Sequence, residues 1–354
     1  MKAIILCAGM AKRLYPLTVT MPKHLIPVAN KPILFYGLEA IRDVGVTEVG
    51  IVVGATRKDI EAAVGNGDKW GLRITYIPQE NPQGLAHAVK ISRNFLQEEP
   101  FIMYLGDNLL KEGLNSFADN FNKNKPNALI LLYEVSNPSQ FGIAIVENGQ
   151  VKKVMEKPKN PPTNLALVGA YIFDHTIYEA IDAIKPSARG ELEITDAIEY
   201  LIENGFVVEP HHVSGWWKDT GRPEDIIEAN RFILDGIKTD IHGQIKGKSQ
   251  IVGRVAIETG TEIIDSIVRG PVAIGKNCKI INSFVGPYTS IGDGVVLENS
   301  EIEHSVMMGN SSIRNIDGRI DNSLLGRNVK VNKIEAKPHV YKLIHGDNSS
   351  TELP

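Results

Sequence analysis

Apolar segments alternate with helix-like segments over the first two thirds of the chain. Compact, β-rich apolar segments lie at 2–6, 49–53, 74–77, 101–105 and 129–133. Segments with helical periodicity lie at 33–43, 57–64 and 85–95. Strands that alternate with helices predict an α/β fold with a mostly parallel, doubly wound sheet covered on both faces. Ligands of such sheets bind beyond the carboxyl ends of the strands, which is where Gly9 and Asp107 fall.

The pattern changes at residue 141. The apolar segments 141–146 and 150–155 flank Glu147-Asn148-Gly149, which is typical of a β-hairpin. Further elements are predicted at 167–173 (a strand), 194–202 and 225–234 (helices). We expect this part to extend the sheet and to close over one side of a binding site.

Helical periodicity stops after Gly236, and apolar residues then recur every six positions. One register holds Ile245, Ile251, Ile257 and Ile263, and two further registers begin at Val268 and Val285. A repeat of this length indicates a solenoid of short parallel strands. Because the register slips at 266–269 and at Phe284, and is poor after Leu297, we expect insertions or irregular coils there.

The length and the change of pattern predict two domains. A chain of 354 residues is long for a single core. We expect an α/β domain at 1–238, a solenoid domain at 239–345 and a flexible tail at 346–354. The two cysteines, Cys7 and Cys278, lack metal-ligand spacing, so we expect buried, reduced thiols.

Composition and charge exclude several classes of partner. The net charge of −4 gives no support for a nucleic-acid or membrane-surface role. No apolar segment approaches the length that spans a membrane. A strand pattern begins directly after the first two residues and leaves no room for a signal peptide, so we expect a cytoplasmic protein.

Candidate chemistry begins at the end of the first predicted strand, where the small residues Ala8 and Gly9 follow an apolar run. A loop of small residues lets backbone N–H groups approach a phosphate chain. Arg13 and Lys23 follow, and two fixed cations can balance the charge of that chain. This stretch predicts a nucleoside triphosphate site.

The same stretch, with Pro-Lys-His-Leu-Ile-Pro-Val at 22–28, resembles the sugar nucleotidyltransferases. Later motifs resemble their glucose-1-phosphate thymidylyltransferase branch, in its long form with a C-terminal extension. Ala11 and Lys12 depart from the glycine and threonine of the family's loop. If this position needs a positive φ, alanine costs about 1–2 kcal/mol there. Lys12 either replaces a hydroxyl contact or points to solvent.

Two further motifs concern the base and the metal. Gln79 and Gly84 match residues that contact the nucleotide base in the family, and a glutamine amide offers both a donor and an acceptor. His87 stands where the family often has glutamine. The resemblance implies that Asp107 and Asp219 bind Mg²⁺. Without the resemblance, Gly84 belongs to a plain strand-to-helix loop and both aspartates are turn or cap residues.

A third group of motifs concerns the sugar. Glu156 and Lys157 match a Glu-Lys-Pro motif that places the carboxylate on sugar hydroxyls and the lysine on the sugar phosphate. Gly142 and Val168 match backbone positions that contact the sugar, and the resemblance implies that Trp217 lies by the sugar or the base. The stretch 190–196 also matches, and its carboxylates serve either the sugar or a helix entry.

The resemblance implies Mg²⁺-dependent nucleotidyl transfer from dTTP to glucose 1-phosphate, with Arg13, Lys23 and Lys157 as the catalytic cations. The product, dTDP-glucose, would supply deoxysugar, rhamnose or polysaccharide synthesis. The likeness of the solenoid to hexapeptide-repeat proteins implies a left-handed β-helix, and we expect a homo-oligomer.

Other functions stay open. The nearest is transfer from UTP, because uracil and thymine differ by one methyl group. A non-catalytic sugar-nucleotide sensor fits the altered loop at Ala11 and Lys12. An acyltransferase in the solenoid could use His304 or His339 as its base. An oxidoreductase is disfavoured, because no G-x-G-x-x-G follows a strand.

Overall fold

The structure, a computed structural model, describes residues 1–9 and 11–333. The described chain packs into two compact units. The first holds 1–9, 21–25 and 33–219, and the second holds 11–20, 26–32 and 220–333. The predicted tail at 346–354 and the end of the predicted solenoid lie outside the described residues. The domain boundary at 238 stays a prediction.

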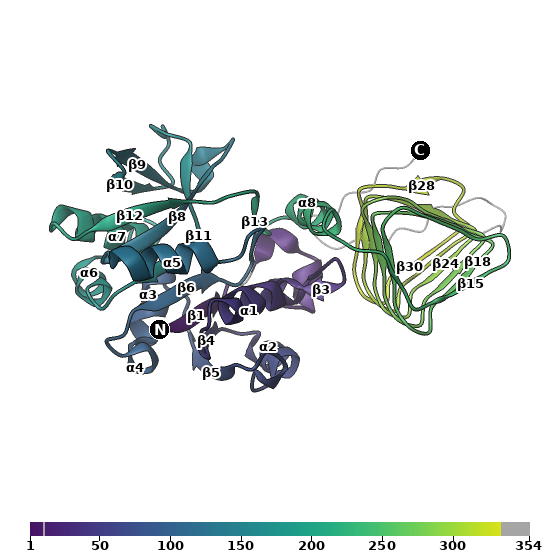
Figure 1. Cartoon of the computed structure of the whole chain (residues 1–354), viewed down its shortest axis with the longest axis horizontal. Coiled ribbons are helices and arrows are strands. Elements are labelled where there is room, and N and C mark those ends of the chain that lie inside the picture. The colour runs from purple at the N-terminus through teal and green to yellow at the C-terminus, as the bar shows by residue number, and fades with distance from the viewer. Residues whose placement is uncertain (10, 334–354) are drawn as a thin grey trace. The chain divides into compact units, whose positions relative to one another are not determined.

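The first unit is built on a nine-stranded mixed sheet of order β10-β9-β11-β6-β1-β4-β5, in which β8 pairs with β11 and β12 pairs with β8 (Figure 1). These strands are β1 (Lys2–Cys7), β4 (Glu48–Val53), β5 (Arg73–Pro78), β6 (Phe101–Leu105), β8 (Ala128–Glu134), β9 (Gly142–Glu147), β10 (Gln150–Glu156), β11 (Leu165–Phe173) and β12 (Val208–His212). Strands β6, β1, β4 and β5 run parallel. The predicted α/β core is confirmed, and β9, β10 and β11 extend it as antiparallel strands.

Seven α-helices belong to the described part of the first unit. They are α1 (Ile33–Asp43), α2 (Arg57–Val64), α3 (Leu85–Ile91), α4 (Arg93–Leu96), α5 (Asn115–Asn124), α6 (Ile177–Ala183) and α7 (Ile194–Glu203). The prediction of one helix at 85–95 is wrong, because Ser92 separates α3 from α4. The Ser92 hydroxyl donates to the carbonyl oxygen of Ala88 at 2.7 Å, and such bonds bend helices. None of the helices in the described chain is both long and apolar enough to span a bilayer.

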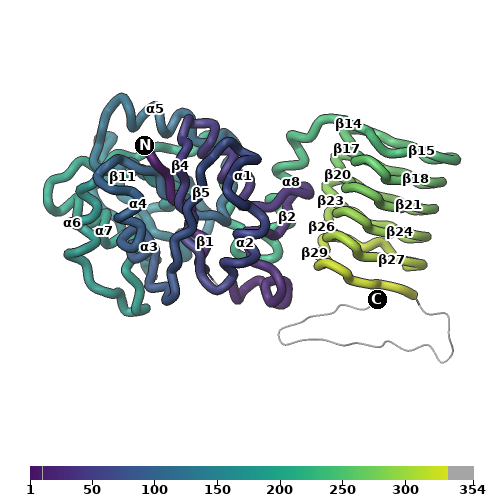
Figure 2. The backbone as a smooth tube through the Cα atoms, turned by 90° about the horizontal axis from the view of Figure 1, so that it is seen from below, coloured from purple at the N-terminus to yellow at the C-terminus, as the bar shows by residue number. Residues whose placement is uncertain are grey.

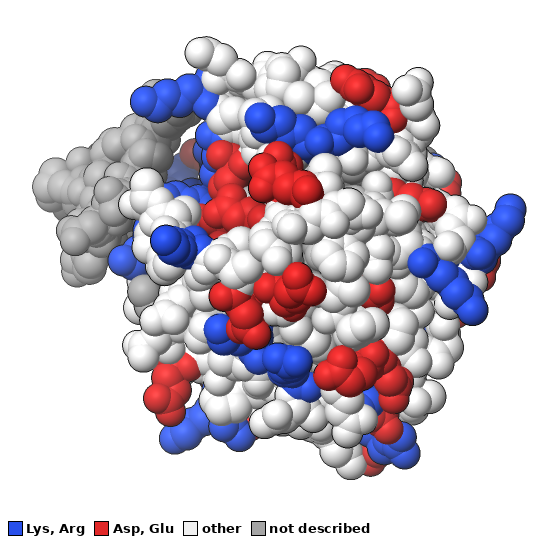
Figure 3. Space-filling view, turned by 90° about the vertical axis from the view of Figure 1, so that its left-hand side faces the viewer, with Lys and Arg blue, Asp and Glu red and all other residues white. Residues whose placement is uncertain are grey.

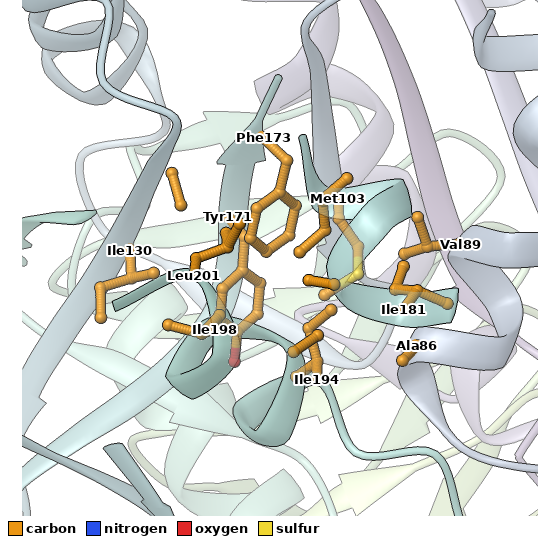
Figure 4. Close-up of a cluster of buried hydrophobic side chains, with 14 of the residues drawn as sticks. Ala86, Val89, Met103, Ile130, Tyr171, Phe173, Ile181, Ile194, Ile198 and Leu201 are labelled. Atoms are coloured by element: carbon orange, nitrogen blue, oxygen red, sulfur yellow. The ribbon is translucent and has the colours of Figure 1, made fainter. Parts of the chain in front are cut away.

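One core of the first unit lies between the sheet and helices α3, α6 and α7. Figure 4 shows Tyr171 of β11 directed toward Ile198 of α7, and Met103 of β6 in the same cluster. Helix α3 contributes Ala86 and Val89, and both are 0% exposed. Burial of a large apolar side chain contributes about 1.5–3 kcal/mol, so α3 is firmly held against the sheet.

The solenoid of the second unit confirms the predicted parallel strands. Figure 2 shows its coils stacked on one another, and together the coils supply strands to three parallel sheets. The first sheet contains β14 (Asp240–Ile241), β17 (Val255–Ile257), β20 (Val272–Ile274), β23 (Thr289–Ile291), β26 (Val306–Met307) and β29 (Leu324–Leu325). The second contains β15 (Gln244–Lys246), β18 (Glu262–Ile264), β21 (Lys279–Ile281), β24 (Val296–Glu298), β27 (Ser312–Arg314) and β30 (Lys330–Asn332). The third contains β16 (Gln250–Val252), β19 (Ile267–Arg269), β22 (Phe284–Val285), β25 (Glu301–Ile302) and β28 (Arg319–Ile320).

The register slips in the sequence have a regular structural cause. Strands β19 and β22 begin where irregular coils were expected, and both pair in register with their neighbours. The inward residues Ile263 and Val268 are both 0% exposed. The step between them is five residues instead of six, and the equivalent steps from Ile280 to Val285 and from Leu297 to Ile302 are five residues as well, so the same side is shorter in these three coils. The expectation of irregular coils at 266–269 and at Phe284 is therefore wrong.

Asn230 joins three segments of the second unit. It lies on α8 (Pro223–Leu234) and is 0% exposed. Its Oδ1 accepts from the backbone N–H of Ala29 at 2.9 Å and from the Ser290 hydroxyl at 2.6 Å. Its Nδ2 donates to the Tyr288 carbonyl oxygen at 3.0 Å. The turn between β2 (Pro27–Val28) and β3 (Lys31–Pro32) is thus bonded to α8 and α8 to a solenoid coil.

We expect Asn230→Ala to loosen this junction. The substitution leaves the half-buried backbone groups of Ala29 and Tyr288 and the buried Ser290 hydroxyl without their partner, which costs about 2–4 kcal/mol. Hydrogen exchange should show faster opening of peptides that cover 26–32 and 288–291. The matched control is Asn204→Ala, which removes an exposed bond to the Tyr200 carbonyl. Equal protection of these peptides in both variants would contradict the prediction.

Candidate functional site

A cleft opens in the first unit beyond the carboxyl ends of β1, β5 and β6. Its cavity volume is about 230 Å³. Six of the residues that the sequence singled out line it, namely Ala8, Gly9, Lys23, Gln79, Gly84 and Asp107. The cleft follows from the parallel strands, because residues that come directly after neighbouring strand ends meet at one edge of the sheet.

The backbone at Ala8 is positioned by a glycine that the sequence analysis missed. A Cβ added to Gly54 would lie 2.8 Å from the carbonyl oxygen of Ala8, so only glycine fits there. Gly54 directly follows β4, which pairs with β1. The sequence signal for Gly54 was a glycine directly after the predicted strand that follows the first one.

Lys23 and Asp107 form an ion pair at the cleft. Burial by itself raises the pKa of the Asp107 carboxyl, but the Lys23 charge and the hydrogen bonds from Lys23 and Asn108 outweigh it and lower the pKa to about 2. Burial lowers the pKa of Lys23, and the charge of Asp107 more than reverses this, so that its pKa is raised. Both groups are therefore charged at neutral pH.

Strand pairing brings Asp219 to the same place. Strand β13 (Trp217–Asp219) pairs antiparallel with β7 (Asn108–Leu110), and Asp219 lies opposite Asn108. The charge of Asp219 also contributes to the raised pKa of Lys23. The two predicted metal ligands, 112 positions apart (219 − 107), are thus neighbours in space. Two carboxylates are a donor set that fits Mg²⁺, which binds few protein oxygens and completes its shell with water and phosphate.

Asn108 organises this region, although the sequence analysis assigned it no role. Its Nδ2 donates to Asp107 Oδ1 at 3.0 Å, and its Oδ1 accepts from Trp217 Nε1 at 2.6 Å. A Cβ added to Gly169 would lie 2.2 Å from Asn108 Oδ1. Trp217 is 8% exposed and contacts the Phe141 ring, so the structure shows it packed beside the carboxylates. The signal for Asn108 was its place directly after Asp107.

His24 is a second residue that the sequence analysis overlooked. Burial and then the charge of Lys23 lower its pKa to about 3, so the ring is neutral. Its Nδ1 is the one buried side-chain N or O atom of the described residues that has no hydrogen-bond partner. Cys7 lies close by and is buried, as predicted, and burial raises the pKa of its thiol.

Gln79 and Gly84 lie together at the start of α3. Gln79 is 4% exposed, and its Nε2 lies 2.9 Å from His87 Nδ1. Gly84 has φ +103°, and a Cβ there would lie 2.3 Å from the Leu192 carbonyl oxygen. Gly84 therefore needs to be glycine for two independent reasons, a left-handed backbone and a close neighbour.

The predicted sugar residues also gather in the first unit. Gly142 of β9 pairs with Glu156 of β10. Glu156 Oε1 lies 3.2 Å from Lys157 Nζ and 2.9 Å from the Arg189 guanidinium, and Oε2 accepts from the Thr195 hydroxyl at 3.0 Å. The stretch 190–196 therefore does contribute a residue beside Glu156. The sequence analysis did not predict Arg189 as a partner of Glu156. The signal that could have found it was a cationic side chain directly before the stretch 190–196.

Val168, Arg13 and the altered loop complete the predicted set. Val168 is 1% exposed on β11, and its contact with a ligand stays a prediction. Ala11 has φ +46°, which confirms that this position is left-handed. Lys12 is exposed, which favours the solvent alternative. Arg13 is exposed on the short helix Lys12–Leu14 of the second unit, and its role stays a prediction.

The solenoid histidines give little support to acyl transfer. His304 Nδ1 lies 2.9 Å from Asp321 Oδ1, and its ring stacks on Tyr288. Glu303, His304 and Asp321 lie close enough to form a cluster of side chains of the kind that binds metal ions. His339 lies outside the described residues.

Known proteins resemble the chain over its whole length. The sequence model of the family described as nucleotidyl transferase matches residues 2–236. A glucose-1-phosphate thymidylyltransferase of Streptomyces griseus is 47% identical over 354 residues, which is 100% of this chain and 99% of that protein.

Two solved structures resemble the fold. One is described as a glucose-1-phosphate thymidylyltransferase from Bacillus anthracis in complex with a sucrose; it has a TM-score of 0.63 and 33% identity and covers 68% of this chain and 98% of that chain. The other is UDP-glucose pyrophosphorylase complexed with UDP-glucose, with a TM-score of 0.59 and 26% identity over 66% of this chain and 98% of that chain. With the family match and the full-length relative, these findings show that the chain belongs to the nucleotidyl transferase family.

Proposed function

We propose that the protein transfers the deoxythymidylyl group of dTTP to glucose 1-phosphate and releases pyrophosphate. The observation that carries the proposal is the charged Lys23–Asp107 pair, with Asp219 beside it, in the cleft that also holds Gln79. The full-length relative of Streptomyces griseus, named for this activity, supports the choice of substrates.

The reaction requires neutralisation of the negative charge on the phosphates, and it does not require a general base. A phosphate oxygen of the sugar phosphate attacks the α-phosphorus of the triphosphate, and the bond from that phosphorus to the bridging oxygen breaks as pyrophosphate leaves. The nucleophile is already an anion, so no general base is required. The barrier arises from bringing two anions together, and fixed cations and correct positioning lower it.

Three cations are proposed to do this. Lys23 binds the α-phosphate, because it is charged at the end of the parallel strands. Lys157 binds the phosphate of the sugar, and its pairing with Glu156 supports a location beside the sugar hydroxyls. Arg13 is proposed on the triphosphate from the family resemblance alone.

Mg²⁺ is the proposed cofactor, and Asp107 and Asp219 would hold it. When bound, the ion supplies positive charge that stabilises the leaving pyrophosphate. Gln79 and Gly84 would contact the base, and backbone N–H groups at Ala8 and Gly9 the phosphates. The backbone of Gly142 and Val168, with Trp217 nearby, would border the sugar.

The predicted domain boundary and oligomeric state are also proposals. We propose that 1–238 is the catalytic domain and that the solenoid from 239 supports a homo-oligomer. A cytoplasmic location stays a prediction. Acidic and basic side chains are interspersed on the face shown in Figure 3, which agrees with small-molecule substrates rather than a nucleic acid.

Transfer from UTP is the second candidate, because a structural relative is complexed with UDP-glucose. Thymine and uracil differ by a methyl group, which a pocket discriminates only modestly. Pyrophosphate release with dTTP and UTP in competition would separate the two. The sensor alternative loses support, because Ala11 keeps the left-handed backbone despite its Cβ.

We expect Asp107→Asn to lower turnover at least about 100-fold, because the substitution removes one charge from the proposed metal site. Pyrophosphate release should be measured against Mg²⁺ concentration. The control is Asp182→Asn, which alters an exposed carboxylate paired with Lys90. Mg²⁺-dependent activity at the wild-type level in Asp107→Asn would remove Asp107 from the site, provided that circular dichroism shows a folded protein.

We expect Lys157→Ala to raise the KM for glucose 1-phosphate about 10- to 100-fold, because it removes a charge-assisted hydrogen bond. The KM for dTTP should change little. Lys152→Ala is the matched control, since Lys152 is exposed on β10, the strand that Lys157 directly follows, and its Nζ donates to Gln150 Oε1. Unchanged kinetics for glucose 1-phosphate in Lys157→Ala would contradict the assigned role.

A further inference from the structure

The amide of Gln79 is held in one orientation by two partners. Its Nε2 lies 2.9 Å from His87 Nδ1 and 3.4 Å from the Gly84 carbonyl oxygen. A carbonyl oxygen can only accept, so the nitrogen of the Gln79 amide, and not its oxygen, faces Gly84. The same nitrogen faces His87, so the His87 Nδ1 is the acceptor and the ring proton sits on Nε2.

This arrangement leaves the amide oxygen for a ligand. Both hydrogens of the Gln79 amide are directed to His87 and Gly84, and Oε1 has no hydrogen-bond partner among the described residues. Gln79 lines the cleft. Thymine and uracil carry an N–H donor at N3, whereas cytosine carries an acceptor at the same position. An amide oxygen without a partner in the described residues therefore accepts from the first two bases and opposes the third.

We propose that His87 is a positioning residue that fixes the Gln79 amide and thereby selects a pyrimidine base with an N3–H donor. This inference rests on the proposed function, in which Gln79 contacts the base.

His87 is well placed for this task because α3 is held rigidly. Ala86 and Val89, on either side of His87, are 0% exposed in the core drawn in Figure 4. The Ala86 N–H donates to the Leu192 carbonyl oxygen at 3.1 Å. Gly84, directly before the helix, packs against the same carbonyl. The His87 ring therefore projects toward Gln79 from a fixed backbone.

The role of His87 depends on its protonation. Burial and then the charge of Lys90 lower the pKa of His87 below 6.5, which keeps the ring neutral at pH 7. Lys90 on α3 is the charge that acts on His87; Asp182 on α6 pairs with Lys90 and with Arg93 on α4, and Glu191, in the loop before α7, lines the cleft. Protonation places an N–H on Nδ1, which then meets the amide nitrogen of Gln79. Two donors repel, so the amide must turn and lose its preference for thymine and uracil.

The test is the ratio of kcat/KM for dTTP to kcat/KM for CTP between pH 5 and 8.5, with glucose 1-phosphate as co-substrate. Above pH 6.5 the ratio in the wild type should be high, and it should fall as the pH drops through the lowered pKa. His87→Leu removes the acceptor and should lower the ratio at neutral pH at least about 10-fold. The KM for glucose 1-phosphate should stay unchanged.

His87→Asn is the rescue variant, because its Oδ1 can accept in place of Nδ1 and does not titrate. The His87→Asn variant should keep a high dTTP-to-CTP ratio at every pH. The titration of cytosine itself also changes the ratio at low pH, but it does so equally in the wild type. If both variants kept the wild-type dTTP-to-CTP ratio and its pH dependence, the inference about His87 would be overturned, and the proposed function would still stand. Failure of the wild type to release pyrophosphate from either dTTP or UTP would overturn the proposed function and this inference with it.

Discussion

A charged lysine–aspartate pair at the end of the parallel strands is the interaction on which the site depends. Removing two charges from water is unfavourable, and a buried pair is seldom the most stable arrangement. Lys23 and Asp107 nevertheless remain ionised, because each stabilises the other and Asn108 donates to the carboxylate. The protein therefore holds positive and negative charge in a fixed place before any ligand arrives. This preorganisation is what the joining of two phosphate anions requires.

The sheet and its hydrogen bonds position the other groups. Strand β13 carries Asp219 to Asn108 by antiparallel pairing, and Trp217 locks Asn108 from the same strand. Gln79 follows β5 and is oriented by His87 from α3. Asn108 and His87 thus fix Asp107 and Gln79 without a direct part in the proposed chemistry. The rigidity of the core behind α3 extends this control to the proposed base site.

The second unit is held together by stacked apolar side chains and by hydrogen bonds from a buried asparagine. Its inward isoleucines stack in columns, and the asparagine Asn230 satisfies backbone groups from segments that are far apart in the chain. Ala11 keeps a left-handed backbone that glycine would adopt more easily, and the Thr18 hydroxyl donates to its carbonyl oxygen at 3.0 Å. Local strain at this loop is thereby offset by a nearby hydrogen bond.

The sequence by itself determined the alternation of strands and helices, the six-residue period, and the strand-end positions of Gly9 and Asp107. These depend on local patterns of apolar residues and on short motifs. Only the tertiary structure decided that the coil at Val268 is regular despite the slip in register, and that Asp219 pairs with Asn108. It also decided which atom of Gln79 faces His87. Such features depend on hydrogen bonds and packing between segments, and a pattern read along one segment does not contain its partner.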